Sequence, residues 1–271
     1  MTDSMSHLAS ASVPLNSKTC LVTGGAGGLG KYLARGFLQA GATVVICDRN
    51  KEALAQTTTE LSKLGSVMGF AADVSKQGDV QQLFDDITSK LGSIDVLVNN
   101  AGITDGNTPV GDCDPDWWDR VIAVNLTGPM LVSRLAIKSM LQKPSPGGCI
   151  INIASISSVA GYMAGAAYTA SKHGLIGLTK NIAGFYGRDG ISCIALQMGG
   201  VVGTDIQASM WGEMHARGAQ QVMEKVAICS KTYCDPEAVA QLCVNIAQDG
   251  QSRLLNGSCM SSDNGFMCEL A

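Results

Sequence analysis

The 271-residue sequence lacks a long apolar run, a run of basic residues and closely spaced metal-binding side chains. Gly, Ser, Lys or Asp interrupts every apolar stretch before about 18 residues, the length that a transmembrane helix needs, so no membrane partner is expected. Lys and Arg number 19 against 23 Asp and Glu, and their mixing along the chain argues against nucleic acid or anionic lipid as a partner. With three histidines and no Cys-x-x-Cys pair, no zinc or other metal site is expected.

Residues 1–17 also lack the features of a targeting segment. They are rich in serine and include Asp3, without the cationic start and apolar core of a secretory signal or the arginines of a mitochondrial one. We therefore expect a flexible N-terminal tail on a cytoplasmic protein.

Ten cysteines are present, but their surroundings do not indicate a disulfide framework. Four of them lie within or beside apolar, strand-like runs, where a thiol behaves as a small hydrophobic group; these are Cys20, Cys47, Cys149 and Cys193. We expect the cysteines to be reduced, as in a cytosolic enzyme.

Short apolar, β-branched runs alternate with helix-like segments along the chain. Residues 29–37 and 80–91 repeat apolar side chains at spacings of three and four, which predicts helices between the strands. The alternation implies right-handed crossovers and a parallel sheet covered on both faces. The sequence thus predicts an α/β, doubly wound Rossmann fold with a seven-stranded, mostly parallel sheet and helices on both faces. The predicted strands are Thr19–Thr23, Thr43–Cys47, Ser66–Ala71, Ile94–Val98, Cys149–Ala154, Ile191–Leu196 and Ser258–Met260.

No repeat, low-complexity tract or linker divides the chain, so residues 18–271 are expected to form one domain. The Gly/Pro cluster at 143–148 stands between a predicted helix and a predicted strand and indicates a turn. Residues 201–231 break the alternation. Their Met210, Trp211 and Met214 fit a substrate lid or, equally well, a helical hairpin packed on the core.

Five glycines occur in the eight residues Thr23–Gly30, between the first predicted strand and the first predicted helix. Gly24, Gly28 and Gly30 permit a tight turn whose N–H groups approach a pyrophosphate at a helix N-terminus. A purely structural turn would need only one or two glycines. Their number and position favour a dinucleotide-binding loop.

Asp48 ends the second predicted strand, 18 residues after Gly30. At about this spacing a carboxylate accepts hydrogen bonds from the adenine ribose and repels a 2′-phosphate, so NAD is the expected cofactor. Two alternatives stay open. Asp48 could simply cap the following helix, and the neighbouring Arg49 could bind the phosphate of NADP.

Tyr168 and Lys172 stand four residues apart and therefore share one face of a predicted helix. A phenol has an ordinary pKa of ~10, so a tyrosine that acts as acid and base near neutral pH needs a lower pKa. We expect the Lys172 ammonium and the positive charge of a nicotinamide cation to favour that shift. Taken alone, such a pair also occurs by chance at the surface.

In combination, these motifs resemble the short-chain dehydrogenase/reductase family, of the non-extended type, over nearly all of residues 18–265. Ser155 precedes Tyr168 by thirteen residues, a separation typical of that family. The resemblance rests on the loop Thr23–Gly30, Asp73-Val74, Asn99-Asn100-Ala101-Gly102, Asn125, Ser155, Tyr168 and Lys172.

The resemblance implies a catalytic set of Asn125, Ser155, Tyr168 and Lys172. Tyr168 would exchange the proton with the substrate oxygen while hydride passes to or from nicotinamide, and Ser155 would hydrogen-bond that oxygen. Lys172 would lower the pKa of Tyr168 and bind the nicotinamide ribose. Asn125 would hold a water that links Lys172 to solvent.

The resemblance also implies the residues that bind the cofactor, with Asp73 and Val74 at the adenine and Asn99 at the adenosine ribose. One loop departs from the family, because Met198 replaces the usual proline and one extra residue precedes Thr204, which loosens the loop. The expected cofactor-binding residues are Gly24, Gly28, Leu29, Gly30, Asp48, Asp73, Val74, Asn99, Ala101, Gly102, Tyr168, Lys172, Val201 and Thr204.

The expected activity is the NAD-dependent interconversion of a secondary alcohol and a ketone, on a neutral lipophilic or cyclic substrate. No Arg or Lys near Ser155, or within 198–214, could pair with a substrate carboxylate. The alternatives are an NADP-dependent carbonyl reductase of a biosynthetic pathway and a catalytically silent nucleotide-binding protein of the same fold, against which the complete catalytic set argues. Candidate substrate contacts are Ser155, Ile156, Tyr162, Met163, Met198, Met210, Trp211 and Met214.

The family resemblance also implies a homo-oligomer, either a dimer or a tetramer. Its interface would use two long helices, predicted at about Asp116–Leu141 and Ala166–Gly187.

Overall fold

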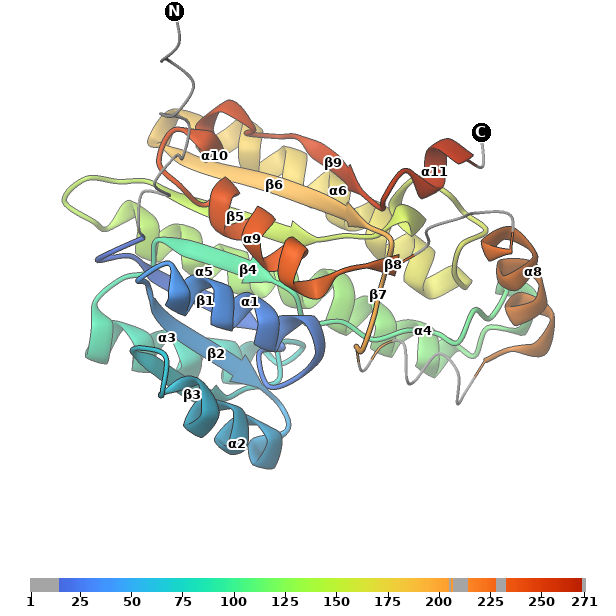
Figure 1. Cartoon of the computed structure of the whole chain (residues 1–271), viewed down its shortest axis with the longest axis horizontal. Coiled ribbons are helices and arrows are strands. Elements are labelled where there is room, and N and C mark those ends of the chain that lie inside the picture. The colour runs from blue at the N-terminus through green and yellow to red at the C-terminus, as the bar shows by residue number, and fades with distance from the viewer. Residues whose placement is uncertain (1–14, 205, 207–213, 228–232, 270–271) are drawn as a thin grey trace, which may run out of the picture.

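The structure, a computed structural model, describes residues 15–204, 206, 214–227 and 233–269. Seven parallel strands form one sheet in the order β3-β2-β1-β4-β5-β6-β9 (Figure 1). Its strands are β1 Thr19–Thr23, β2 Thr43–Asp48, β3 Val67–Ala71, β4 Val96–Asn99, β5 Gly148–Ile153, β6 Ile191–Met198 and β9 Cys259–Ser262. This confirms the predicted fold, with strand ends shifted by one or two residues.

The central strands are buried on both faces, which explains why they read as continuous apolar runs. In β1, Cys20 and Val22 belong to the core on one side of the sheet, and Leu21 belongs to the core on the other side. The same burial raises the pKa of the Cys47 and Cys149 thiols to about 12. These thiols therefore serve as packing groups.

Helices cover both faces of the sheet. Helices α1 and α9 pack against each other on one face, together with α2, while α3, α5 and α6 cover the other (Figure 1). In α1, Leu29, Leu33 and Phe37 recur every four residues and are buried against the strands. The helix bounds are α1 Gly28–Gln39, α2 Lys51–Leu61, α3 Gln77–Leu91, α4 Pro115–Ile122, α5 Gly128–Leu141, α6 Ala166–Tyr186, α8 Ala216–Val226, α9 Pro236–Ile246, α10 Gln251–Leu254 and α11 Phe266–Glu269.

The helix predicted at Asp116–Leu141 is not one regular α-helix, which corrects that prediction. Asp114 caps α4 by accepting the backbone N–H of Asp116 at 2.8 Å, and a π-helical turn, Ala123–Thr127, then separates α4 from α5. By its length and apolar composition, the stretch Pro115–Leu141 could cross a membrane, since its most apolar 18 residues have a mean hydropathy of 1.3. However, 56% of those 18 residues are buried in the fold. A core helix of a globular domain has these same properties.

The strand order reverses between β1 and β4, and the chain from these strands leaves in opposite directions across the sheet. In doubly wound folds, ligands bind at the carboxyl ends of the strands beside such a reversal. Two short strands, β7 Gly200–Val201 and β8 Tyr233–Cys234, pair in parallel near these ends. Together with α8, they lie beyond the carboxyl end of β6 (Figure 1).

Candidate functional site

A cavity of about 590 Å³ lies at the carboxyl ends of the parallel strands. Its wall includes the residue that follows β1, the last residue of β2, and residues that follow or end β4, β5 and β6: Gly24, Asp48, Asn100, Ala154 and Met198. The volume lies within the usual range for small-molecule sites, roughly 300–1,000 Å³. The fold therefore provides a large cavity at the position where doubly wound sheets bind ligands.

The glycine loop forms one end of this cavity. Gly24 and Gly28, both in the wall, have φ values of +64° and +46°, in the left-handed region that favours glycine. Gly30 lies outside the wall and serves packing, because a Cβ there would overlap the carbonyl oxygen of Gly24. The loop thus brings main-chain atoms next to the cavity at the N-terminus of α1, as a pyrophosphate requires.

Asp48 and Arg49 both line the cavity at the end of β2. The Asp48 carboxylate accepts the N–H of Asn50 at 3.0 Å and the N–H of Ala26 at 3.3 Å. The cap of α2 is Asn50, whose side chain accepts the N–H of Ala53 at 3.1 Å. Asp48 is therefore not the helix cap and joins β2 to the glycine loop instead.

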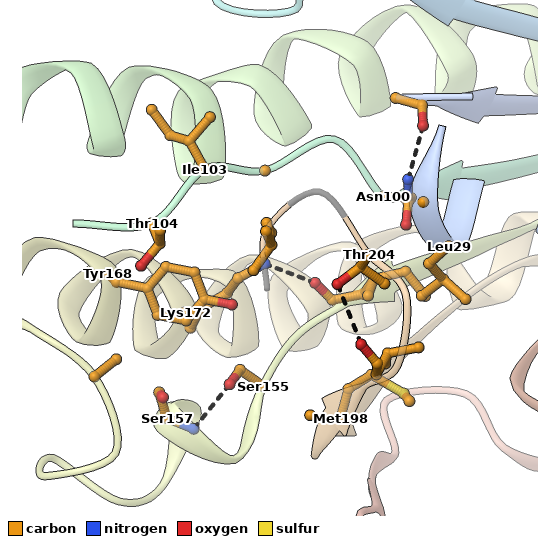
Figure 2. A pocket seen from close by; sticks show the side chains of 18 of the residues that line it. Leu29, Asn100, Ile103, Thr104, Ser155, Ser157, Tyr168, Lys172, Met198 and Thr204 are labelled. Atoms are coloured by element: carbon orange, nitrogen blue, oxygen red, sulfur yellow. Dashed lines mark hydrogen bonds between the residues drawn. The ribbon is translucent and has the colours of Figure 1, made fainter. Parts of the chain in front are cut away.

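Ser155 follows β5 directly and is held by a reciprocal pair of hydrogen bonds. Its Oγ accepts the N–H of Ser157 at 3.1 Å (Figure 2). Its own N–H donates to Oγ of Ser158 at 3.2 Å. This capping box fixes the start of the short 3₁₀ turn Ile156–Ser158. The Ser155 hydroxyl consequently has a fixed position in the cavity wall.

Tyr168 and Lys172 project from α6 toward the same region as Ser155 (Figure 2). Nζ of Lys172 donates to the carbonyl oxygen of Ile153 at 2.8 Å. Burial raises the pKa of Tyr168 to about 12, although a hydrogen bond with Ser155 opposes the shift. Burial also lowers the pKa of Lys172 to about 8. Burial is therefore the main influence on the pKa of Tyr168. The downward shift expected from Lys172 and the nicotinamide stays a prediction.

Asn125 lies in the π-helical turn and is fully buried, outside the cavity wall. Its Nδ2 donates to the carbonyl oxygen of Ile103 at 2.8 Å and to Oγ of Ser171 at 3.3 Å, and its Oδ1 accepts the N–H of Ile103 at 2.9 Å. Asn125 thus ties the loop after β4 to α6. The expected water between Asn125 and Lys172 stays a prediction.

Most of the expected cofactor residues line the cavity. Besides Gly30, the exception is Asn99, whose amide is buried behind the wall and donates to Oδ1 of Asn152 at 2.8 Å and Oγ of Ser133 at 3.0 Å. It joins β4 to β5 and α5 rather than contacting the cavity. The expected residues in the wall are Gly24, Gly28, Leu29, Asp48, Asp73, Val74, Ala101, Gly102, Tyr168, Lys172, Val201 and Thr204.

The expected substrate contacts are divided by the structure. Ser155, Ile156, Met163, Met198 and Met214 line the cavity, whereas Tyr162 is half exposed and lies outside its wall. Met210 and Trp211 lie outside the described residues.

Two wall residues from α4 were not predicted from the sequence. The Arg120 guanidinium lies 5.3 Å from the ring centre of Trp117, and both side chains line the cavity. Arg120 therefore adds a cation to the cavity wall that the sequence did not predict, because α4 brings it there from a distant part of the sequence. No spacing relative to Ser155 could have indicated this placement.

Helix α8 closes one side of the cavity with Ala219, Val222, Met223 and Val226. Its entry is bound to the loop after β4. The N–H of His215 donates to the carbonyl oxygen of Gly106 at 2.7 Å, and Nδ2 of Asn107 lies 3.4 Å from the sulfur of Met214. The described part of the predicted lid is thus a helix packed on the β4–α4 loop.

Comparisons with known proteins agree with this arrangement. A family model described as short chain dehydrogenase matches residues 18–214. The chain is 47% identical over 265 residues to a short chain dehydrogenase/reductase of Gibberella zeae, covering 97% of this chain and 98% of that protein. It is 36% identical over 253 residues to 3beta-hydroxysteroid dehydrogenase 2 of Eggerthella lenta, covering 93% of this chain and 95% of that protein.

A solved structure shares the fold. A variant of actinorhodin polyketide ketoreductase with NADPH matches with a TM-score of 0.82 at 29% identity, covering 92% of this chain and 97% of that chain. At this identity and coverage the likeness extends across nearly the whole domain.

Proposed function

The chain belongs to the short-chain dehydrogenase/reductase family, and on that basis we propose that it interconverts a neutral, lipophilic or cyclic secondary alcohol and its ketone, with NAD as the preferred cofactor. Membership makes the chain an NAD(P)-dependent oxidoreductase that acts between an alcohol and a carbonyl compound. The identity of the cofactor and that of the substrate belong to the proposal.

The observation that carries the proposal is that Ser155, Tyr168 and Lys172 line one cavity together with the glycine loop. Ser155 would orient the substrate oxygen and Tyr168 would donate a proton to it or take one from it. A carbonyl that becomes an alkoxide needs donors fixed at the developing charge, and both hydroxyls are held on rigid elements. Lys172, one turn along α6, would bind the ribose next to them.

The residues at the other end of the cavity fit a dinucleotide. Gly24, Gly27 and Gly28 line the cavity and carry no side chain, so nothing separates their backbone from it. That loop would hold the pyrophosphate, Asp48 the adenine ribose, and Asp73 and Val74 the adenine. When bound, the nicotinamide cofactor supplies or accepts the hydride, while the protein provides placement and proton transfer.

The preference for NAD rests on Asp48, whose carboxylate would repel a 2′-phosphate. Arg49 also lines the cavity and favours a second candidate, an NADP-dependent carbonyl reductase. The solved relative with NADPH makes this alternative concrete. We place NAD first because Asp48, the last residue of β2, is fixed in the cavity wall by the N–H groups of Ala26 and Asn50.

The proposed substrate is neutral and apolar because the wall away from the glycine loop is built mainly from aliphatic and aromatic side chains. They are Ile156, Met163, Met198, Val222, Val226 and Phe266. We propose that α8 acts as a lid over this part of the cavity. Arg120 lies in the same wall, so a hydroxy acid belongs among the substrates tested.

The deciding experiment is a fluorescence titration of the purified protein with NADH and NADPH, followed by a panel of secondary alcohols and ketones with the better cofactor. Tighter NADH binding and turnover of cyclic alcohols or ketones are expected. Equal or tighter NADPH binding would contradict the role given to Asp48. Efficient turnover of only a small hydroxy acid would contradict the proposed substrate class and implicate Arg120.

We also propose that the protein forms a homo-oligomer, a dimer or a tetramer. Support comes from apolar side chains exposed on the two long helices of the predicted interface: Met130 and Leu141 of α5, and Phe185 of α6, which is 72% exposed. Light scattering on the purified protein should give at least twice the mass of one chain. A monomer at micromolar concentration would contradict the proposal.

A further inference from the structure

Asp105 is a buried acid for which neither the catalytic set nor the cofactor site has a use. It lies in the loop between β4 and α4, it is only 1% exposed, and it is not part of the cavity wall. An ionised carboxylate in such a place is costly unless its oxygens are hydrogen-bonded. The partners of Asp105 therefore indicate what it does.

Both carboxylate oxygens accept hydrogen bonds from the N-terminus of α6. Oδ1 accepts the N–H of Gly165 at 3.1 Å, and Oδ2 accepts the N–H of Tyr168 at 2.9 Å. Gly165 precedes this helix at its N-cap position, and it has no side chain with which to cap the free N–H groups. Asp105 supplies the missing cap from another part of the chain.

The geometry leaves no room for an ordinary cap. A Cβ at Gly165 would overlap the Asp105 carboxyl group, although its φ of −76° and ψ of 179° would suit a serine or aspartate cap. Glycine at this position and the acid at 105 therefore belong together. One of the two capped N–H groups is that of Tyr168 itself.

The loop that carries Asp105 is fixed on both sides of it. Two residues earlier, Ile103 is bound through its N–H and its carbonyl oxygen by the Asn125 amide. Three residues later, the hydroxyl of Thr108 donates to the Asp105 carbonyl oxygen at 2.7 Å, and the backbone carbonyl oxygen of Thr108 accepts the N–H of Ala166 at 2.9 Å. The carboxylate thus has a fixed position relative to β4 and to α6.

We propose that Asp105 is a positioning residue for the reaction: by capping α6 from the β4–α4 loop, it fixes Tyr168 relative to Ser155 and the cavity. The inference rests on the proposed function, because it assigns to Tyr168 the proton transfer described above. The carboxylate does not touch the cavity and acts through the helix.

The charge of Asp105 gives the cap a second effect. Three groups face the Tyr168 side chain: the Asp105 carboxylate from the loop, the Ser155 hydroxyl from the end of β5 and the Lys172 ammonium from α6. Burial raises the pKa of Tyr168, the Ser155 hydrogen bond lowers it, and the negative charge of Asp105 raises it further. Neutralising Asp105 therefore moves the ionisation of Tyr168 to lower pH.

Three single variants separate the cap from the charge. Asp105→Asn keeps the shape of the side chain but places an NH₂ group against one of the two N–H donors. Asp105→Ala removes the cap altogether. Asp119→Asn removes an exposed acid of α4 and is the matched control. We expect kcat to fall roughly ten- to a hundredfold in both Asp105 variants, the scale on which a misplaced group affects catalysis. The Kd of the preferred cofactor should change less than about twofold, and the control should match the wild type.

The pH dependence of alcohol oxidation provides a readout that a merely structural cap would not move. In Asp105→Asn, the alkaline rise of kcat/KM should begin at lower pH than in the wild type, because the phenol ionises more readily. A wild-type kcat with a wild-type pH profile in Asp105→Asn and Asp105→Ala would overturn the proposal.

A transplanted cap provides the rescue. In the double variant Asp105→Ala with Gly165→Asp, the space left by the Asp105 carboxyl accommodates a cap on the helix itself. Its kcat should be about tenfold higher than that of Asp105→Ala. Failure of the double variant to improve on Asp105→Ala counts against the proposal.

Amide hydrogen exchange of the first turn of α6 tests the cap without any turnover. Exchange should accelerate at least about tenfold in Asp105→Ala and slow again in the double variant. If the wild type oxidises no alcohol and reduces no ketone, the proposed function fails while the exchange result still decides the cap. If exchange is unchanged in Asp105→Ala, the cap fails whatever the activity.

Discussion

Nζ of Lys172 lies 5.5 Å from the ring centre of Tyr168, yet it donates its hydrogen bond to the carbonyl oxygen of Ile153. The ammonium is thus anchored to the end of β5 rather than to the phenol. Its distance from the ring leaves burial as the main influence on the pKa of Tyr168, which is about 12. At neutral pH the phenol of Tyr168 is therefore protonated. In the proposed mechanism it can donate a proton as it stands, and it needs a lower pKa to act as a base.

Replacing Tyr168 by phenylalanine should abolish most of the turnover and spare cofactor binding. The phenol is the proton donor in the proposed mechanism, and such groups contribute typically 10²- to 10⁴-fold. We expect kcat of Tyr168→Phe to fall by about that factor, with the Kd for NADH within about twofold of the wild type. Tyr162→Phe, which changes a half-exposed tyrosine outside the cavity wall, should retain full activity. Full activity in Tyr168→Phe would rule out the proposed proton transfer.

The two directions of the reaction should respond differently to pH. Ketone reduction uses the protonated phenol, whereas alcohol oxidation uses the phenolate, whose fraction grows about tenfold per pH unit while the pH is below the pKa. Between pH 6 and about 8, kcat/KM for oxidation should therefore rise steeply while that for reduction stays nearly constant. Initial rates in both directions across this range provide the measurement. A plateau of the oxidation rate within this range would show that the pKa of Tyr168 during turnover is far below about 12.

Lys172 should cost the protein stability at neutral pH. Burial lowers its pKa from 10.5 to about 8, so below pH 8 both the folded and the unfolded chain carry the proton and the burial cost is present in full. As the pH rises from 8 to 10.5, the folded state releases the proton first and the cost disappears. We expect Lys172→Met to raise the free energy of unfolding at pH 7 by roughly 1–3 kcal/mol, part of the cost being offset by the hydrogen bond to Ile153.

Urea unfolding of Lys172→Met and the wild type at pH 7 and pH 10 measures this cost directly. The stability difference should narrow at the higher pH, and the variant should lose activity at both. Lys180→Met changes an exposed lysine of the same helix and should leave the stability within about 0.5 kcal/mol of the wild type. A destabilised Lys172→Met would mean that the hydrogen bond outweighs the desolvation.

Asp48 and Arg49 should have opposite effects on cofactor preference. Asp48→Asn keeps an acceptor for the N–H of Asn50 but removes the charge that repels a 2′-phosphate. Affinity for NADH should fall roughly tenfold and that for NADPH should rise. Arg49→Ala should weaken NADPH alone. Parallel fluorescence titrations with both cofactors measure the two ratios, and an unchanged ratio in Asp48→Asn would assign the discrimination to another residue.

Gly218 should control the position of α8. A Cβ there would overlap the carbonyl oxygen of Asn107, so Gly218→Ala must push the start of α8 away from the loop after β4. We expect KM for the alcohol or ketone to increase by about tenfold, with little change in the Kd of the cofactor. Gly161→Ala is the control, because nothing lies within 4 Å of a Cβ at that position. Steady-state kinetics that leave KM unchanged in Gly218→Ala would argue against a lid role for α8.

The sequence alone was sufficient for the strands and the glycine loop. The bounds of β1, Thr19–Thr23, follow from an apolar run that is buried on both faces and flanked by polar and glycine residues. Gly24 and Gly28 could be placed in a tight turn because backbone with positive φ strongly favours glycine, which is visible in the sequence. The same holds for Tyr168 and Lys172, whose spacing sets their common helix face.

Other features depend on contacts between distant segments, and no local sequence pattern indicates them. Arg120 reaches the cavity only because α4 lies against α6, and Asp105 caps α6 only because the loop after β4 crosses its N-terminus. Asn125 was assigned from the family motif, but its amide faces Ile103 and Ser171 instead of the cavity. Periodicity and spacing describe neighbours along one helix or strand, and they do not predict contacts between residues of different elements.

The π-helical turn Ala123–Thr127 holds one more residue than an α-turn would. Each residue of an α-helix rotates the side-chain direction by about 100°, so the surplus residue sets the phase between α4 and α5. It lets Trp117 and Arg120 point at the cavity while Val132 and Ala136 point at the sheet. A one-residue deletion in this turn would keep every one of these side chains in the sequence and yet remove the first two from the wall.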